Sequence, residues 1–451
     1  MTVTDDDRPL PFHLRGNYAP VFEEVTETEL TVEGQLPAEL TGLYVRNGAN
    51  PKTGRSPHWF AGDGMLHGVR IDGGNASWYR NRWVRTKHLD DPKARQIGPD
   101  GSVDRTIGVN NTHIVRHAGK ILSLVESSFP CEMTPELDTV GVYDFDGRLD
   151  TAMTAHPKIC ALTGEMHFFG YGFFPPYLTY HRVSADGELV QSEVIDVAGP
   201  TMIHDFSITE HHVLFMDLPV VFDLDLAMKG GMPYRWDDDY AARVGVMPRG
   251  GTGNDVRWFD VDPCYVFHPM NSFEQSTAGG GTSIVVDTAR YPDLWRADSA
   301  KFNNDAALHR WTLDLDTGSV AEEPLDDRLI EFPRVHDDLV GLVNRYGYAV
   351  ATEQIGDSAP KSQLVKYDLE SGASEVHDFG TDRITGEAVF VPAEAATSED
   401  EGWLMSFVYD KPSDTSALVV LDATNVAAEP VATVQLPRRV PFGFHGSWFT
   451  D

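Results

Sequence analysis

Cysteine is scarce in this chain of 451 residues, which contains only Cys131, Cys160 and Cys264. Their separations match no metal-binding cysteine motif, and an odd, sparse set argues against a disulfide framework. We therefore expect three buried, reduced thiols and a cytoplasmic protein. The first ten residues, MTVTDDDRPL, are acidic and lack the apolar core of a signal peptide, which favours the same location.

Positive charge and long apolar runs are also lacking. The chain has 36 Lys and Arg against 69 Asp and Glu, a net charge of −33. Nucleic acid is excluded as a partner by this balance, because phosphate binding needs a basic surface. No run of 18 apolar residues is present, so we expect no membrane-spanning helix. The hydrophobic share of 41% is still ample for a large core.

Helical periodicity is rare, and short β-rich runs separated by Asp-Gly turns dominate the sequence. Asp hydrogen-bonds the local backbone and Gly accepts a positive φ, so an alternating run, such a turn and a second run predict a β-hairpin. Four copies of this pattern are centred on Asp72–Gly73, Asp186–Gly187, Asp316–Gly318 and Asp368–Gly372.

Hairpins dispersed over several hundred residues favour a β-propeller or another large antiparallel assembly. The period is irregular because long insertions separate the copies, notably residues 225–244. Insertions of this kind form loops on one face, where functional sites usually lie. No low-complexity linker interrupts the chain, so we expect one domain over residues 1–451.

Four of the 17 histidines stand among apolar residues, each far from the others in sequence. Taken singly, each is more often a hydrogen-bonded core residue than a metal ligand. Their separations of 48, 64 and 177 residues are compatible with different blades that each send one histidine to a common axis. The last of the four is followed by six residues only, yet it lies among aromatics. The four are His156 in TAHPKI, His204 in MIHDFSIT, His268 in YVFHPMNSFE and His445 in FGFHGSWF.

His113 and His117 have the i, i+4 spacing of a helical metal pair. Their β-branched neighbours and the AGK turn that follows favour a strand instead. On a strand, this spacing places the two side chains roughly 13 Å apart, too far to share an ion. We therefore expect no metal at this pair.

Longer motifs in a fixed order make the chain resemble the carotenoid cleavage oxygenase family, from Leu36 to the C-terminus. The resemblance implies an all-β fold, a seven-bladed β-propeller with a cap of loops and short helices on one face. Residues 1–35 would form an N-terminal extension that packs on the propeller. The motifs that carry the resemblance are LPAELTGLYVRNGANP, HWFAGDGMLHG, AHPKI, MIHDFSITE, FMDLP, VFHPMNSFE, IEFPRV, GEAVFVP, EDEGWL and FHGSW.

This resemblance also implies a site, a non-haem Fe(II) held by His156, His204, His268 and His445. Four neutral imidazoles leave the charge of the ion uncompensated, and ligating histidines normally donate their other N–H to a carboxylate or carbonyl. The family uses three glutamates for this purpose, and the matching residues here are Glu126, Glu331 and Glu387. Without the resemblance, ordinary surface glutamates would be the simpler interpretation. Thr112 matches a family threonine whose methyl group crowds a vacant position on the iron.

The implied reaction is the cleavage of one C=C bond of a carotenoid or apocarotenoid by O2, which gives aldehyde or ketone products. Stilbene-cleaving relatives that grip a phenol typically carry a lysine where this chain has Val125, so an apolar polyene is favoured as substrate. Cleavage of a stilbenoid or another phenylpropenoid alkene by the same chemistry is the alternative. Four imidazoles also suit zinc, copper or nickel, so iron is implied by the resemblance and not by the ligand set.

We expect aromatic residues to line an apolar tunnel for the polyene, although as many of them suit the core. A small apolar lip would give weak peripheral contact with a membrane, because the acidic surface cannot provide it. Two alternatives from other classes are a zinc hydrolase on a propeller and a non-catalytic propeller scaffold, and a metal assay separates them. The aromatic candidates are Trp59, Phe60, Phe206, Phe273 and Phe444.

Overall fold

A computed structural model describes residues 10–229, 232–296, 305–352 and 362–451 of the chain. Within these ranges strands dominate, and the only α-helices are α1 (Lys87–Asp90) and α2 (Leu224–Met228). None of the described helices combines the length and the apolar character needed to cross a bilayer.

All four predicted Asp-Gly hairpins are present. The strand pairs are β4 (Gly64–Asp72) with β5 (Asn75–Trp83), β12 (Leu178–Val183) with β13 (Leu189–Ile195), β22 (Ala307–Asp314) with β23 (Val320–Arg334), and β25 (Gln363–Asp368) with β26 (Ala373–Asp378). A glycine in each turn has a positive φ, between 54° and 91°, which a residue with a Cβ rarely adopts. The turn chemistry therefore sets these hairpins locally.

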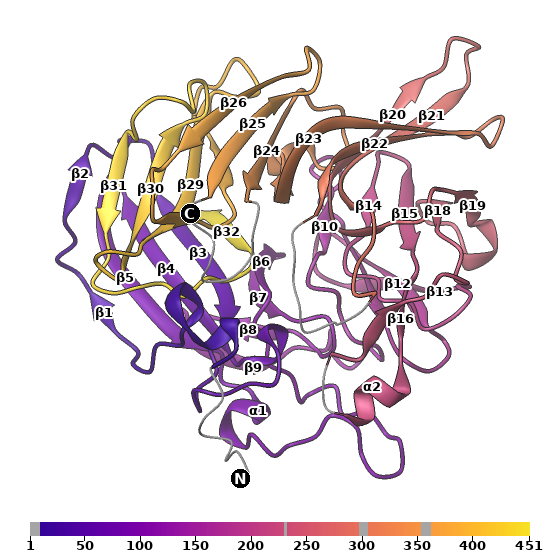
Figure 1. Cartoon of the computed structure of the whole chain (residues 1–451), viewed down its shortest axis with the longest axis horizontal. Coiled ribbons are helices and arrows are strands. Elements are labelled where there is room, and N and C mark those ends of the chain that lie inside the picture. Colours follow the sequence, from indigo (N-terminus) through magenta and orange to yellow (C-terminus); the bar gives the residue numbers. More distant parts are fainter. Residues whose placement is uncertain (1–9, 230–231, 297–304, 353–361) are drawn as a thin grey trace, which may run out of the picture.

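Seven antiparallel sheets form the blades of a β-propeller, as the all-β prediction required (Figure 1). The first three have four strands each. They are β6 (His113–His117), β7 (Lys120–Leu124), β8 (Cys131–Met133) and β9 (Thr139–Val142); β10 (Lys158–Ile159), β11 (Met166–Tyr171), β12 and β13; and β14 (Ser207–Ile208), β15 (His212–Asp217), β18 (Arg243–Pro248) and β19 (Arg257–Asp260). A separate ribbon, β16 (Val220–Phe222) with β17 (Tyr234–Trp236), branches from the third blade.

The fourth and fifth blades share the long strand β23. They are β20 (Tyr265–Ser276), β21 (Thr282–Tyr291), β22 and β23, followed by β23, β24 (Tyr346–Ala351), β25 and β26. The sixth blade contains β27 (Arg383–Thr385), β28 (Val389–Pro392), β29 (Gly402–Asp410), β30 (Thr415–Asp422) and β31 (Ala432–Gln435). Pairing between the two chain ends completes the sixth and seventh blades.

The N-terminal and C-terminal segments close the ring together. Strand β2 (Val32–Gly34) pairs with β31 of the sixth blade. In the seventh blade, β32 (Gly446–Thr450) pairs with β3 (Gly42–Ala49), and the order continues through β4 and β5 to β1 (Thr26–Glu27). Figure 1 shows the indigo β2 beside the yellow β31, where the two ends of the sequence meet.

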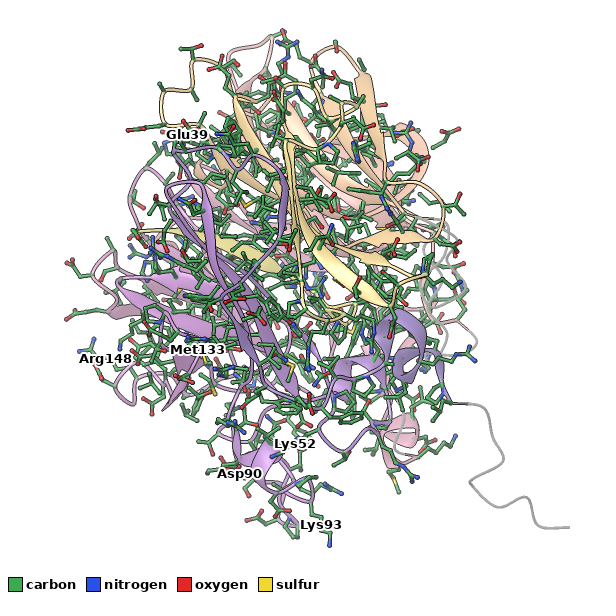
Figure 2. The ribbon with its side chains drawn as sticks, turned by 90° about the vertical axis from the view of Figure 1, so that its left-hand side faces the viewer. Glu39, Lys52, Asp90, Lys93, Met133 and Arg148 are labelled. Atoms are coloured by element: carbon green, nitrogen blue, oxygen red, sulfur yellow. The ribbon has the colours of Figure 1, made fainter. Side chains whose placement is uncertain are left out.

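Apolar side chains fill the spaces between neighbouring blades. One cluster joins the sixth and seventh blades through Tyr44, Val69, Met405 and Leu418, each at most 2% exposed. The three cysteines are buried free thiols, as predicted. Figure 2 shows the charged residues Glu39, Arg148 and Lys93 at the periphery of the molecule. The dry layers between blades hold the inner strands in fixed positions.

Candidate metal centre

Four histidines from four different blades meet at one point. His268 lies in β20, His445 directly precedes β32, and His156 and His204 lie in the segments just before β10 and β14. Each of these strands is the edge strand of its sheet. The convergence across separations of 48, 64 and 177 residues is therefore a product of the ring of blades.

The backbone is irregular beside two of the four histidines. His268 precedes Pro269, and the pairing of β20 with β21 shifts register on both sides of this proline. Proline cannot donate to the ladder, and it is tolerated in a sheet at such irregularities. At the chain end, His445 donates its backbone N–H to Thr112 O, and β32 then pairs with β3. Regular pairing begins immediately beyond His445, and in β20 it resumes at Asn271.

The ring nitrogens are close enough to share one ion. One ligand atom from each histidine lies within 4.8 Å of the other three, and all four side chains are buried. His156 Nε2 is 3.0 Å from His204 Nε2, which in turn is 3.2 Å from His268 Nε2. This is the only such group of His, Cys, Asp and Glu among the described residues.

Three of the four outer nitrogens, the Nδ1 atoms, face a glutamate. His204 Nδ1 contacts Glu126, His268 Nδ1 is 2.6 Å from Glu331 Oε2, and His445 Nδ1 is 2.8 Å from Glu387 Oε1. A carboxylate only accepts, so each Nδ1 must carry the hydrogen. The Nε2 atoms of His204 and His268 then present lone pairs to each other at 3.2 Å. This arrangement repels unless a cation lies between the lone pairs, so the residues fit a metal ion.

Each glutamate is fixed by further hydrogen bonds. Tyr171 donates its hydroxyl to Glu126 (2.5 Å), and Tyr291 and the backbone N–H of Phe332 donate to Glu331 (2.9 and 2.7 Å). Glu387 accepts from the Gly446 N–H at 2.9 Å and from Arg334 at 3.1 Å. These donors hold the carboxylates in place even though Glu331 and Glu387 are almost inaccessible to water.

Burial and the paired charges set the protonation of the site. Burial lowers the pKa of His156 well below its ordinary value, and lowers the pKa of His445 to about 4 although Glu387 opposes this. Burial alone would raise the pKa of Glu387, but Arg334 and His445 lower it. Against burial, Glu331 raises the pKa of His268, so this ring is more basic than those of His156 and His445. Neutral imidazoles and ionised carboxylates suit a divalent cation.

Thr112 lies beside the histidine cluster, where its backbone oxygen accepts the His445 N–H at 3.1 Å. Its hydroxyl donates to Asn111 Oδ1 at 2.9 Å. His113, the next residue, lies in strand β6, so the predicted strand is confirmed for the His113/His117 pair. The ring of His113 packs against His445, with centroids 5.2 Å apart, and its Nδ1 bonds Ala155 O. His113 therefore borders the cluster.

A cavity of about 910 Å³ opens onto one side of the cluster, lined by His204, His268 and His445. The predicted Trp59, Phe60 and Phe444 line it. The prediction was wrong for Phe206, which packs into a core cluster, and for Phe273, which is buried away from the wall. The Phe206 side chain points into the packing between the second and third blades, a direction that the sequence does not specify.

Sequence reasoning missed several aromatics on the cavity wall. Phe173 and Phe174 come from the GYGFFPPY stretch after β11, and Met232 and Tyr234 come from the insertion at residues 225–244. Gly230 and Gly231 of that insertion lie outside the described residues. A run of aromatics and prolines beyond a strand could have been recognised as a wall segment. The other aromatics on the wall are Tyr171, Phe267, Tyr291 and Phe332.

The inner strands of this propeller bring four histidines together at one point, beside a large aromatic cavity. This arrangement defines the class of the protein, a non-haem metal-dependent enzyme with a propeller fold. Comparison with known proteins agrees. The family model described as retinal pigment epithelial membrane protein matches residues 18–450. A carotenoid cleavage oxygenase of Mycobacterium tuberculosis is 40% identical over 490 residues, with 97% of each chain covered.

Two further proteins extend the comparison. Carotenoid 9,10(9',10')-cleavage dioxygenase 1 of Arabidopsis thaliana is 36% identical, with 99% of this chain and 91% of that protein covered. The crystal structure of lignostilbene dioxygenase from Pseudomonas brassicacearum superposes with a TM-score of 0.86 at 28% identity, covering 99% and 100% of the two chains. The chain belongs to the carotenoid oxygenase family, and it is an oxygenase.

Proposed function

We propose that this protein is an Fe(II)-dependent dioxygenase that cleaves one C=C bond of a carotenoid or apocarotenoid with O2, giving aldehyde or ketone products. The observation that carries the proposal is the position of the four-histidine cluster at the wall of a cavity of about 910 Å³. Cavities of this size bind extended apolar molecules, and a few polar groups fix their orientation. The curated relatives that cleave carotenoids support the substrate class.

His156, His204, His268 and His445 would hold the iron in this proposal. When bound, Fe(II) supplies open coordination positions at which O2 is activated. Glu126, Glu331 and Glu387 keep the hydrogen on each Nδ1, so the Nε2 atoms stay available as ligands.

The aromatic wall has two tasks in the reaction. Residues such as Trp59, Phe60 and Phe444 exclude water from the reacting bond and give the polyene a flat apolar surface. Phe332 stacks on His268 and Phe267 meets His204 edge-on, with ring centroids 5.6 and 5.1 Å apart. The double bond nearest to these rings is therefore held at a fixed distance from the histidines.

Cleavage of a stilbenoid is the second candidate, favoured by the superposition on lignostilbene dioxygenase. Val125, next to Glu126, lies on the cavity wall where a phenol-binding relative would be expected to carry lysine. An apolar residue there provides no charge for a phenol. The chain belongs to an oxygenase family, which excludes the two alternatives from other classes, a zinc hydrolase and a non-catalytic scaffold.

The test is turnover with a defined metal. Protein purified without a histidine tag would be loaded anaerobically with Fe(II), then given O2 and a panel of carotenoids, apocarotenoids and hydroxystilbenes. We expect aldehyde or ketone products from a polyene, with oxygen from 18O2 in the products. Turnover of hydroxystilbenes alone would assign the stilbenoid activity, and no product from any alkene with full iron loading would refute the proposal.

We further propose that the protein acts in the cytoplasm and meets membranes only through an apolar lip at the cavity mouth. Phe174, Ile97 and Val103 line the cavity and are 63%, 46% and 36% exposed. Exposed apolar side chains at a rim favour weak contact with lipid. Sedimentation with neutral vesicles should fall when Phe174 is replaced by Ser, and unchanged sedimentation would contradict this contact.

A further inference from the structure

A second cavity, of about 280 Å³, lies on the other side of the histidine cluster. It is lined by His156, His268 and His445, whereas the large cavity is lined by His204, His268 and His445. Among the described residues, only His268 and His445 line both cavities. Three of the four candidate ligands thus border a second space. Its wall also carries charged groups, which are Arg116, Lys158, Asp205, Arg334, Asp337 and Glu387.

His156 differs from the other three histidines at its outer nitrogen. No described carboxylate lies within hydrogen-bonding distance of His156 Nδ1, and the nearest is Asp205, with Oδ2 at 3.9 Å. Both side chains are buried, 5% and 3% exposed, and both line the second cavity. At this separation the interaction is a charge contact, because hydrogen bonds require a shorter distance.

Asp205 is itself firmly held. Lys158 contacts its two carboxylate oxygens at 2.8 and 3.0 Å, and the backbone N–H of Phe206 donates to Oδ1 at 2.7 Å. Asp205 follows His204 directly, and Lys158 lies two residues after His156. The pair therefore connects the segments that carry two of the candidate ligands. These contacts fix Asp205 Oδ2 in front of His156 Nδ1.

We propose that Asp205, held by Lys158, is the positioning carboxylate of His156, acting across the second cavity. His156 is then the most weakly fixed of the four ligands, because the other three have a carboxylate in hydrogen-bonding contact with Nδ1. Carboxylates that orient a ligating histidine raise its basicity and metal affinity, and their loss typically costs 10- to 100-fold. The longer contact of Asp205 should contribute less, about 3- to 10-fold.

The test measures Co(II) affinity and the visible spectrum of the Co(II) protein, neither of which depends on turnover. Asp205→Asn keeps the size and the acceptor for Phe206 N–H but removes the charge. We expect Asp205→Asn to bind Co(II) 3- to 10-fold more weakly than the wild type and to shift the absorption band. Both effects should be smaller than those of Glu331→Gln. The assignment would be overturned if Asp205→Asn kept the wild-type Co(II) affinity and spectrum while Glu331→Gln bound Co(II) more weakly.

A second variant tests the same proposal if Asp205→Asn does not fold. Lys158→Met leaves the carboxylate in place but removes its anchor, so the same absorption band should shift. If Asp205→Asn does not fold, Lys158→Met decides alone, and an unchanged Co(II) spectrum in it would overturn the assignment.

A different feature, on the wall of the large cavity, bears on substrate choice. His88 lines this cavity, and its Nδ1 is 2.9 Å from Asp63 Oδ1. Asp63 is buried, and its second oxygen accepts the backbone N–H of Lys52 at 2.9 Å. Thr86 caps the helix α1 that carries His88, and Leu89 of the helix is buried. Figure 2 shows that Lys52, Asp90 and Lys93 lie together at the lower end of the molecule, the region of α1 in Figure 1.

Gln96, on the segment after helix α1, is also held by hydrogen bonds at one end of its side chain. Its amide nitrogen donates to the carbonyls of Ile107 and Ser127, which leaves the Oε1 atom available. Gln96 also lines the large cavity. Asp63 likewise occupies Nδ1 of His88 and leaves Nε2 available. Two polar groups, each fixed at one end, thus stand in a wall that is mostly apolar, which is how cavities recognise one polar atom of an apolar ligand.

From this placement we infer that His88, oriented by Asp63, selects polyenes whose end group carries oxygen. This inference rests on the proposed polyene substrate. A neutral ring accepts a hydrogen bond from a hydroxyl at Nε2, and a protonated ring donates one to a carbonyl. One such bond is worth about 0.5–1.5 kcal/mol, which corresponds to a 2- to 12-fold change in affinity.

The test compares two polyenes of equal conjugated length, one with a ring hydroxyl and one without. Binding would be followed by quenching of tryptophan fluorescence in metal-free protein, so that it does not require turnover. His88→Phe should weaken the hydroxylated polyene 2- to 12-fold and leave the hydrocarbon unchanged, whereas the exposed control His211→Phe should change neither. Equal effects of His88→Phe on both polyenes, or no effect, would overturn the inference. Wild-type protein that binds a polyene but does not cleave it would refute the proposed function and leave this binding result standing.

Discussion

A single buried histidine carries little information about function, because buried imidazoles are commonly satisfied by core hydrogen bonds. His181 is fully buried and is bound to Thr151 and Ser192. His268 is equally enclosed, but its outer nitrogen is taken by Glu331 and its inner nitrogen faces two other histidines. At the residue scale, the direction of both nitrogens distinguishes a candidate ligand from a core residue.

Replacing one ligand should release the metal. We expect His204→Ala or His268→Ala to lower metal affinity by at least tenfold and to abolish turnover, because each variant removes one of the four metal–nitrogen bonds. Metal analysis after dialysis measures this directly. The matched control is His181→Ala, which should keep one metal per chain, and a His204→Ala protein with full metal content would remove His204 from the ligand set.

At the scale of elements, a short strand at the chain end determines where one candidate ligand lies. Strand β32 has five residues, yet it closes the seventh blade on β3 and begins directly after His445. Ser447 pairs with Val45 in this ladder, and its hydroxyl donates to Ile114 O at 2.7 Å, which connects it to the first blade. The ligand position thus depends on a strand that the chain end supplies.

Breaking this pairing should destabilise the fold. Ser447→Pro removes a backbone donor and clashes with the ladder, which we expect to cost about 3 kcal/mol. Ser447→Ala is the matched control and should cost only about 0.5–1.5 kcal/mol, for one hydrogen bond. Thermal unfolding measures both. His445→Ala should stay folded but bind metal weakly, and an equal loss in Ser447→Pro and Ser447→Ala would contradict the role of the pairing.

Contacts between blades also depend on charge. Glu274 of β20 accepts from Thr209 and from the backbone N–H of His211, and its two oxygens are 2.9 and 3.0 Å from His211 and His212. Burial alone would raise the pKa of Glu274, but the hydrogen bonds from His212, Thr209 and His211 lower it well below its ordinary value. This carboxylate joins the turn before β15 to the next blade.

A carboxylate with a depressed pKa stabilises the folded state only while it is ionised. Its contribution is fully present above the pKa of an unfolded glutamate, about 4.3, and is lost as the pH falls below about 5. We therefore expect the stability of the wild type to fall more steeply than that of Glu274→Gln between pH 5 and pH 3. Urea unfolding at each pH measures the difference, and parallel curves would contradict this assignment.

At the scale of the whole molecule, the ring of blades creates the site and the metal should in turn stabilise the ring. The ligands come from blades two, three, four and seven, so an ion bound by all four connects distant parts of the chain. A ligand that binds only the folded state stabilises it by about 2.7 kcal/mol at a concentration one hundred times its Kd.

Metal removal should therefore lower the Tm without unfolding the protein. We expect a chelated sample to melt earlier than the Fe(II) protein kept anaerobic, and the Tm to recover when Fe(II) returns. Mg²⁺ is the control, since this hard cation prefers oxygen ligands and should not shift the Tm. A Tm that is independent of Fe(II), or an equal shift in His445→Ala, would show that the four histidines do not hold the ion.

The sequence by itself determined the features that depend on near neighbours. The Asp-Gly turns at Gly73 and Gly372 require a positive φ wherever they occur, so their hairpins follow from a few adjacent residues. The strand at His113–His117 follows from β-branched neighbours in the same way. The resemblance carried by longer motifs supplied the propeller, the four histidines and their three glutamates.

Only the tertiary structure decided what depends on blades that are distant in sequence. His268 and His445 are 177 residues apart, and their ring centroids come within 4.8 Å because β32 closes the propeller on β3. Phe206 and Phe444 each lie within two residues of a candidate ligand in sequence, but Phe206 fills a core and Phe444 lines the cavity. Asp205 faces His156 across a second cavity that no local pattern contains. The reason is physical, since side-chain direction at an inner strand end is fixed by the packing of neighbouring blades and not by the residues beside it.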